Sequence, residues 1–117
     1  MAQRRQLIKL PEFEWQLPAG IHPTTRELLS LKQIWRDGLQ YVSLQDLEAE
    51  QLVNLAVARI EQTPEDFDYA VLGDRTYSKE ELKSEILNKT EVGQEYVRGL
   101  QAWLDRLFRK IAREEYS

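Results

Sequence analysis

A chain of 117 residues is long enough to bury one hydrophobic core and is expected to form a single domain. Apolar residues make up 42% of the chain and charged residues 31%, which is typical of a globular protein and excludes disorder of the whole chain. The absence of cysteine excludes disulfides, thiolate metal sites and cysteine nucleophiles, and a net charge of −4 argues against general binding to nucleic acid or to an anionic membrane.

The sequence contains no run of about 18 apolar residues, so no membrane span is predicted. The first residues, MAQRRQLIK, are basic, but neither an apolar signal core nor a small-residue cleavage site follows them. We therefore expect a cytoplasmic protein that does not bind membranes.

Residues 1–23 are predicted to form an extended N-terminal arm. Residues that disfavour a continuous helix are spread along it: Pro11, Pro18, Gly20 and Pro23. Between these residues Phe13, Trp15 and Leu17 alternate with polar residues, which is the period of a strand, so they share one side of it. The arm either covers its own core or binds another chain. We favour the first, because apolar residues near a terminus usually tie that terminus down.

The remaining residues, 24–117, are predicted to form a single helical domain. Thr24 and Glu27 have the spacing of a capping box, in which each side chain bonds the backbone amide of the other residue. This pattern predicts a helix over 24–37 that ends before Gly38, a typical stop. Its inward face would consist of Leu28, Leu31, Ile34 and Trp35.

A short extended link, residues 39–42, leads to a second predicted helix. Ser43 and Asp46 form a weaker capping box at its start. Residues 52–58 are apolar almost all round, which is typical of a helix buried on several sides, so we expect this helix to be the central partner of the last one. Its inward stripe comprises Leu44, Leu47, Leu52, Leu55, Ala56 and Arg59 and is widened by Val53, Val57 and Ile60.

Residues 63–77 allow two interpretations. Thr63-Pro64 followed by two acids is a strong helix start and predicts a short helix to about Val71. The alternative is a β-hairpin with strands at 69–72 and 75–77 joined by a tight turn. We favour the helix.

Ser78 and Glu81 form a capping box for the next helix, which is expected to end near Asn88. Its inward side chains would be Leu82, Ile86 and Leu87. No glycine or proline separates this helix from the last one, so the two could also form one bent helix.

The last helix, Thr90 to about Arg113, has the strongest pattern in the sequence. Thr90 is suited to cap its start, and the basic residues at its end suit the helix dipole. Gly93 lies among its apolar positions, where it would let a neighbouring backbone approach closely. The apolar face must be covered by the rest of the chain or by a partner: Val92, Tyr96, Val97, Leu100, Trp103, Leu104, Leu107, Phe108 and Ile111.

These patterns together predict an all-α protein. We expect a small bundle of four to five helices with short connections, antiparallel neighbours and an extended N-terminal arm. A short β-hairpin near 69–77 is the alternative within this fold.

No catalytic or metal-binding pattern stands out. His22, the one histidine, lies beside Pro23 before a predicted helix, which is a poor position for an oriented base. The spacings of zinc sites, calcium loops and glycine-rich phosphate loops are missing. The acids Glu80, Glu81 and Glu85 are explained by capping and by the helix dipole. We therefore expect no enzyme, no catalytic residues, no metal and no cofactor.

The favoured function is a non-catalytic protein–protein interaction module, meaning an adaptor, assembly or accessory protein that binds another protein or itself as a homodimer. Three tryptophans and five tyrosines are many for this length, and aromatic residues with arginine are typical of interface hot spots. The predicted partner-binding residues come from the arm and from the apolar face of the last helix: Phe13, Trp15, Leu17, Trp103, Leu107 and Ile111.

The alternative function is a small nucleic-acid-associated regulator that uses the basic last helix. Basic clusters bind phosphates by releasing counterions, and Arg4 and Arg5 could add to this one. The overall acidity of the chain and the dipole explanation make nucleic acid the less favoured partner. The residues that would bind it are Arg98, Arg106, Arg109, Lys110 and Arg113.

Overall fold

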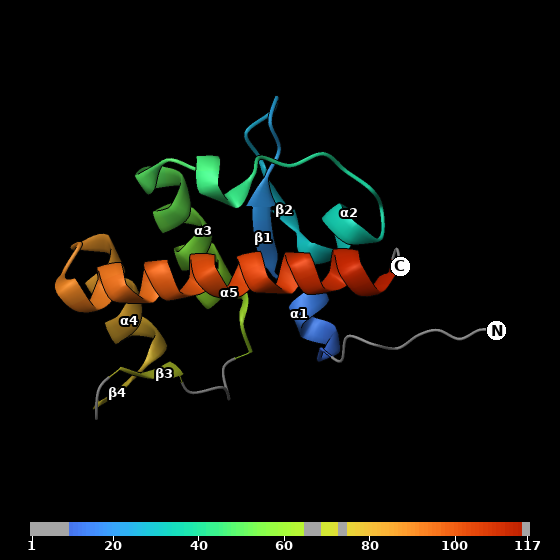
Figure 1. The fold of residues 1–117 in the computed structure, drawn as a ribbon. Coiled ribbons are helices and arrows are strands. Elements are labelled where there is room, and N and C mark those ends of the chain that lie inside the picture. Colours follow the sequence, from blue (N-terminus) through green and yellow to red (C-terminus); the bar gives the residue numbers. More distant parts are fainter. Residues whose placement is uncertain (1–9, 65–68, 73–74, 116–117) are drawn as a thin grey trace.

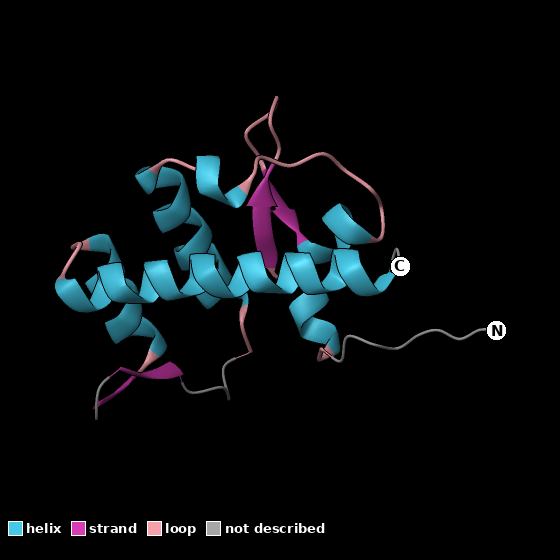
Figure 2. Ribbon diagram, in the orientation of Figure 1, coloured by secondary structure: helices cyan, strands magenta, loops and turns pink. Residues whose placement is uncertain are grey.

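The computed structural model describes residues 10–64, 69–72 and 75–115, and most of these residues are helical (Figures 1 and 2). The elements in chain order are α1 Glu12–Gln16, β1 Pro18–Ile21, β2 Leu28–Ser30, α2 Leu31–Trp35, the 3-10 helix η1 Leu44–Asp46, α3 Ala49–Gln62, β3 Tyr69–Leu72, β4 Arg75–Tyr77, α4 Lys79–Leu87 and α5 Glu91–Glu115. Within these described ranges, no helix combines the length and the apolar character needed to cross a bilayer.

The long helix α5 crosses the whole molecule, and the other elements lie along it (Figure 1). It packs against α4 near its own N-terminus, and against α3 and η1 farther along. The prediction of a mostly helical protein is confirmed. The prediction of a bundle is not, because two antiparallel hairpins, β1–β2 and β3–β4, interrupt the helices and α1 and α2 are only five residues long.

The N-terminal segment is not the extended arm that the alternation predicts. Residues 12–16 form α1, and Trp15 and Leu17 are only 7% and 3% exposed. Two contacts hold α1 and the residue after it against α2. The Arg36 guanidinium lies 4.2 Å from the centre of the Trp15 ring, and the Leu31 amide donates to the Leu17 carbonyl at 3.2 Å. In residues 10–23, the described part of this segment, Trp15, Leu17 and Ile21 are buried in the core, as the favoured interpretation expects.

The predicted capping box at Thr24 is wrong, because Thr24 lies in the turn of the β1–β2 hairpin. The His22 amide donates to the Glu27 carbonyl at 2.9 Å, and Arg26 takes the left-handed conformation with φ 66°. The strands on either side of this turn, β1 and β2, pair with each other in place of the helix predicted over 24–37. This pairing buries all of β1 and Leu29 of β2.

The helix α2 therefore starts later than predicted, with Ser30 as its cap. The Ser30 hydroxyl accepts the Gln33 amide at 3.1 Å, and the Gln33 side-chain oxygen accepts the Ser30 amide at 2.8 Å. The helix ends at Trp35 with Arg36 as its C-cap, slightly before the predicted end near Asp37, and Gly38 lies beyond the cap with φ 75°, the left-handed conformation.

The second predicted helix is divided in two. Ser43 precedes only the single turn η1 and its side chain makes no capping bond, so the weaker capping box is wrong. The helix α3 starts at Ala49, and the Gln51 side chain accepts the Glu48 amide at 2.9 Å. Its central position is confirmed, since α3 packs against β1, α4 and α5 and buries Leu55, Ala56, Arg59 and Ile60.

Residues 69–77 contain the hairpin β3–β4, so the favoured helix to Val71 is wrong and the alternative is confirmed. Tyr69 pairs with Tyr77 across the hairpin, and the Tyr77 side chain is buried. Thr63, the predicted helix start, instead ends α3, where its hydroxyl donates to the Arg59 carbonyl at 2.7 Å. The acids that follow Pro64 lie outside the described residues.

The last two helices are separate and follow the prediction closely. Ser78 and Glu81 form the expected capping box, and the Thr90 hydroxyl accepts the Gly93 amide at 3.1 Å. Between the helices Lys89 has φ 55°, which reverses the chain direction and excludes one bent helix. The pattern predicts that Leu87 faces inward, but its side chain is 57% exposed, so this part of the prediction is wrong.

Gly93 is where α4 and α5 touch through their backbones. A Cβ built on Gly93 would lie 2.2 Å from the Glu85 carbonyl oxygen and 2.7 Å from the Ile86 Cα. The predicted close approach of a neighbouring backbone is confirmed.

One continuous core joins both halves of the chain. Each helix and strand whose side chains are described contributes at least one residue to this core. Its most completely buried large side chains are Leu31, Leu55, Ile60, Leu82, Ile86, Leu104 and Ile111. This core fixes α5 against the N-terminal elements and so positions the surface described next.

Candidate functional site

The candidate functional site is a groove of 520 Å³ along the C-terminal half of α5, which we term the basic groove. Its volume lies in the range of ligand-binding clefts. It is lined by Leu10, Trp103, Arg106, Leu107, Arg109, Lys110 and Arg113.

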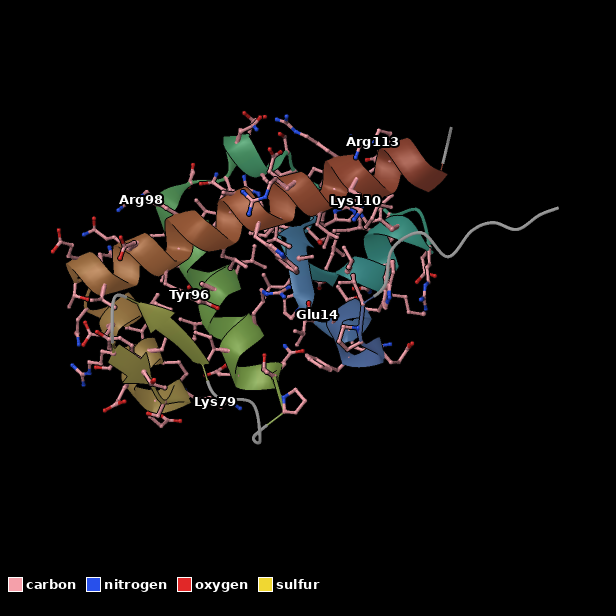
Figure 3. The ribbon with its side chains drawn as sticks, turned by 60° about the horizontal axis from the view of Figure 1, so that its bottom comes forward. Glu14, Lys79, Tyr96, Arg98, Lys110 and Arg113 are labelled. Atoms are coloured by element: carbon pink, nitrogen blue, oxygen red, sulfur yellow. The ribbon has the colours of Figure 1, made fainter. Side chains whose placement is uncertain are left out.

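The four basic residues share one face of α5. Positions 106, 109, 110 and 113 have the spacing i, i+3, i+4 and i+7, which places side chains side by side on a helix. All four side chains are exposed. Figure 3 shows Lys110 and Arg113 at the C-terminal end of α5 and Arg98 nearer its N-terminal half.

Only one of these cations is paired with an acid among the described side chains. The Arg109 guanidinium lies 3.0 Å from the Asp105 carboxylate, and the Arg109 side chain is 70% exposed. No ion pair joins Arg106, Lys110 or Arg113 to any side chain that the structure describes. Unpaired cations side by side attract an anionic partner, because their potentials add.

The floor of the basic groove is apolar. Leu107 is 8% exposed, whereas Leu10 and Trp103 are half-buried and keep part of their surface open. A partly solvent-exposed aromatic ring with arginines beside it is typical of a hot spot at a protein interface.

Trp103 is backed by a buried polar network. The Arg59 guanidinium lies 5.5 Å from the centre of the Trp103 ring, within the range of a cation–π contact. Arg59 itself is fixed by the Pro18 carbonyl at 2.7 Å and by the Glu14 carboxylate at 2.8 Å. The network joins α1, β1, α3 and α5, so the ring is held by four elements.

The six predicted partner-binding residues divide by burial. The structure places Trp15, Leu17, Leu107 and Ile111 in buried positions, so these four do not form the free apolar surface that was expected. Phe13 and Trp103 are half-buried. Of the six, only Trp103 and the edge of Leu107 line the basic groove.

The five cations predicted for nucleic acid also divide. Four of them line the basic groove, whereas Arg98 lines a separate hollow of 290 Å³ with Leu52, Val53 and Val97. Arg4 and Arg5 lie outside the described residues.

Sequence reasoning missed Leu10 and the role of Arg59. Leu10 reaches the groove only through the tertiary fold, and nothing in its neighbourhood in the chain pointed to α5. Arg59 did carry a signal, since an arginine on an otherwise apolar helical stripe must find buried partners.

The other predicted candidates have structural explanations. The His22 Nδ1 accepts the amides of Thr24 at 3.1 Å and Thr25 at 3.2 Å, so this nitrogen stabilises a turn. Glu81 caps α4, and the Ser78 amide that it accepts holds the pKa of this carboxyl below its ordinary value. Among the described residues, no group of three or more histidine, aspartate or glutamate side chains is placed to hold a metal ion.

A third hollow, of 370 Å³, also has Arg109 in its lining. It contains Trp35, Tyr41 and Phe108, whose rings meet edge to face, and burial raises the pKa of the Tyr41 phenol. The single basic residue in the lining of this hollow is Arg109, which forms an ion pair with Asp105. Its chemistry therefore specifies a partner less well than that of the basic groove.

No family model matches this chain, and comparison with curated proteins and with solved structures gave no match. The function is therefore inferred from the residues of the chain itself.

Proposed function

We propose that this protein is a non-catalytic interaction module that binds another protein through the basic groove, in the role of an adaptor or accessory protein. The observation that carries the proposal is the half-exposed ring of Trp103 in a groove lined by four exposed cations. Most binding energy at protein interfaces comes from such aromatic and arginine positions.

The rigidity of the groove supports the proposal. A binding surface costs less conformational entropy when it is already ordered before the partner arrives. The floor belongs to the core, and Arg59 holds the Trp103 ring from the inner side. The proposed surface thus differs from the one the sequence predicts: Trp103 of α5 remains part of it, whereas Trp15 belongs to the core.

Two matched variants test the proposal. Arg106→Glu changes the charge inside the groove, and Arg98→Glu makes the same change at another exposed position of the same helix. Tagged wild-type and variant proteins are incubated with native lysate, with and without nuclease, and the retained proteins are identified by mass spectrometry. We expect partners that survive nuclease, are kept by Arg98→Glu and are lost by Arg106→Glu. Identical protein sets for all three chains would refute the proposal.

Binding of single-stranded nucleic acid is the second candidate, because it also combines cations with an aromatic ring. The cations at 106–113 span only about 10 Å of the helix axis, which is short for the roughly four or more nucleotides that such sites bind. The net charge of −4 also opposes a polyanion. Partners that disappear on nuclease treatment would favour this candidate.

A further inference from the structure

We propose that the basic groove recognises a short, extended, acidic segment of the partner protein, with one apolar or aromatic side chain of that segment seated on Trp103. This inference rests on the proposed function and names the chemistry of its partner. Charge, length and the nature of the floor each support it.

Charge selects an acidic partner. Arg109 is already paired with Asp105 at 3.0 Å, which leaves Arg106, Lys110 and Arg113 without a described acid. Carboxylates of a partner would form ion pairs with these three cations. Charge-assisted hydrogen bonds to arginine and lysine are among the stronger polar contacts.

Length selects a short segment. Positions 106 and 113 are separated by seven residues, or about 10 Å along the helix axis. An extended chain covers this distance with about three residues, since each adds about 3.3 Å. Two or three acidic side chains in one extended stretch would therefore match the row of cations.

The floor selects an apolar anchor within that segment. Leu10 and Trp103 are half-buried and form an apolar strip beside the cations, with the buried Leu107 beneath it. A purely acidic peptide would leave this strip in water, whereas a peptide with a central aromatic or aliphatic residue would cover it.

A direct binding measurement tests the inference. The probe is a fluorescein-labelled pentapeptide with a central phenylalanine, one acidic residue on each side of it and an alanine at each end, titrated with the full-length protein and followed by fluorescence anisotropy at low salt. Two further peptides serve as probes of specificity: the same peptide with alanine at the centre, and one with lysines in place of the acids. A labelled oligothymidine is titrated in parallel.

We expect the acidic phenylalanine peptide to bind most tightly and to weaken as salt is raised. Replacing its phenylalanine by alanine should weaken binding about tenfold, because an anchor group contributes at least one apolar side chain's burial. Arg106→Glu should also weaken binding about tenfold, and Arg98→Glu should leave it unchanged. Trp103→Leu should reduce the difference between the two acidic peptides, because the aromatic part of the floor is lost while Leu10 and Leu107 remain.

Three results would overturn the inference: equal binding of the acidic and the basic peptide, equal effects of Arg106→Glu and Arg98→Glu, or tighter binding of oligothymidine than of any peptide. The lysate experiment separates this failure from that of the proposed function. If proteins are captured through Arg106 while the acidic peptides do not bind, the interaction module stands and its acidic partner segment is refuted. If neither is observed, both fall.

Discussion

Gly93 offers the sharpest test of how α4 and α5 pack. Alanine at this position would place its Cβ 2.2 Å from the Glu85 carbonyl oxygen, whereas ordinary van der Waals contact begins near 3.4 Å. The two helices would have to separate by the difference, about 1.2 Å, because backbone on both sides cannot move aside as a flexible side chain can. Gly99, in the same helix, has nothing within 4 Å of the same built atom and is exposed.

The two glycines therefore predict opposite effects of one substitution. Overpacking at Gly93 costs up to about 3 kcal/mol, and the better helix propensity of alanine returns about 1 kcal/mol, so Gly93→Ala should lower the free energy of unfolding by about 2 kcal/mol. Gly99→Ala should raise it by about 1 kcal/mol through propensity alone.

Urea denaturation followed by far-ultraviolet circular dichroism measures both free energies on the intact chain. The midpoints of thermal unfolding of the two variants should differ by about 10 °C for a domain of this size. If Gly93→Ala is as stable as Gly99→Ala, the backbones of α4 and α5 do not meet as the structure has them.

Three further predictions concern local interactions. Glu14→Gln should lower the free energy of unfolding by about 2–3 kcal/mol, because it leaves the buried Arg59 guanidinium without its acidic partner. Glu12→Gln is the control and should change the free energy of unfolding by less than about 0.5 kcal/mol, since the Glu12–Arg36 pair is exposed. Urea denaturation of both variants measures the two changes, and equal effects would contradict the prediction. Ser78→Ala should cost about 1 kcal/mol through loss of the N-cap, and an unchanged denaturation midpoint would show that this cap does not stabilise the fold. The Glu81 pKa is held below its ordinary value of 4.5 by the Ser78 amide, so its charged form stabilises the fold above that value and this contribution disappears as the pH falls through the lowered pKa. The stability difference between wild type and Glu81→Gln should therefore shrink on acidification, and a difference that stays constant would contradict the assignment.

Features that depend on neighbours a few residues apart are predictable from the amino-acid sequence alone. The capping box of Ser78 and Glu81 and the cap at Thr90 each depend on hydrogen bonds within one helical turn, so the local pattern is sufficient to predict them. The strong apolar period of the last helix likewise predicted that it would be long and would pack along one face.

Where two local patterns compete, contacts between distant parts of the chain determine which one forms. Thr24 had a valid capping pattern, but strand pairing across the turn that contains it joins Pro18 to Ser30, and a pairing of this kind cannot be weighed from either strand alone. Residues 69–77 were decided in the same way, by pairing of Tyr69 with Tyr77.

The candidate site follows the same division. Helical spacing alone places the cations of 106–113 on one face of α5, and the same spacing places Trp103 in the apolar arc of that helix. Sequence could not decide which residues of the apolar arc would stay in contact with water, because periodicity gives the direction of a side chain and not what covers it. Ile111 and Trp103 lie in the same arc, and only packing buries the first completely and leaves the second half-open over the buried Arg59.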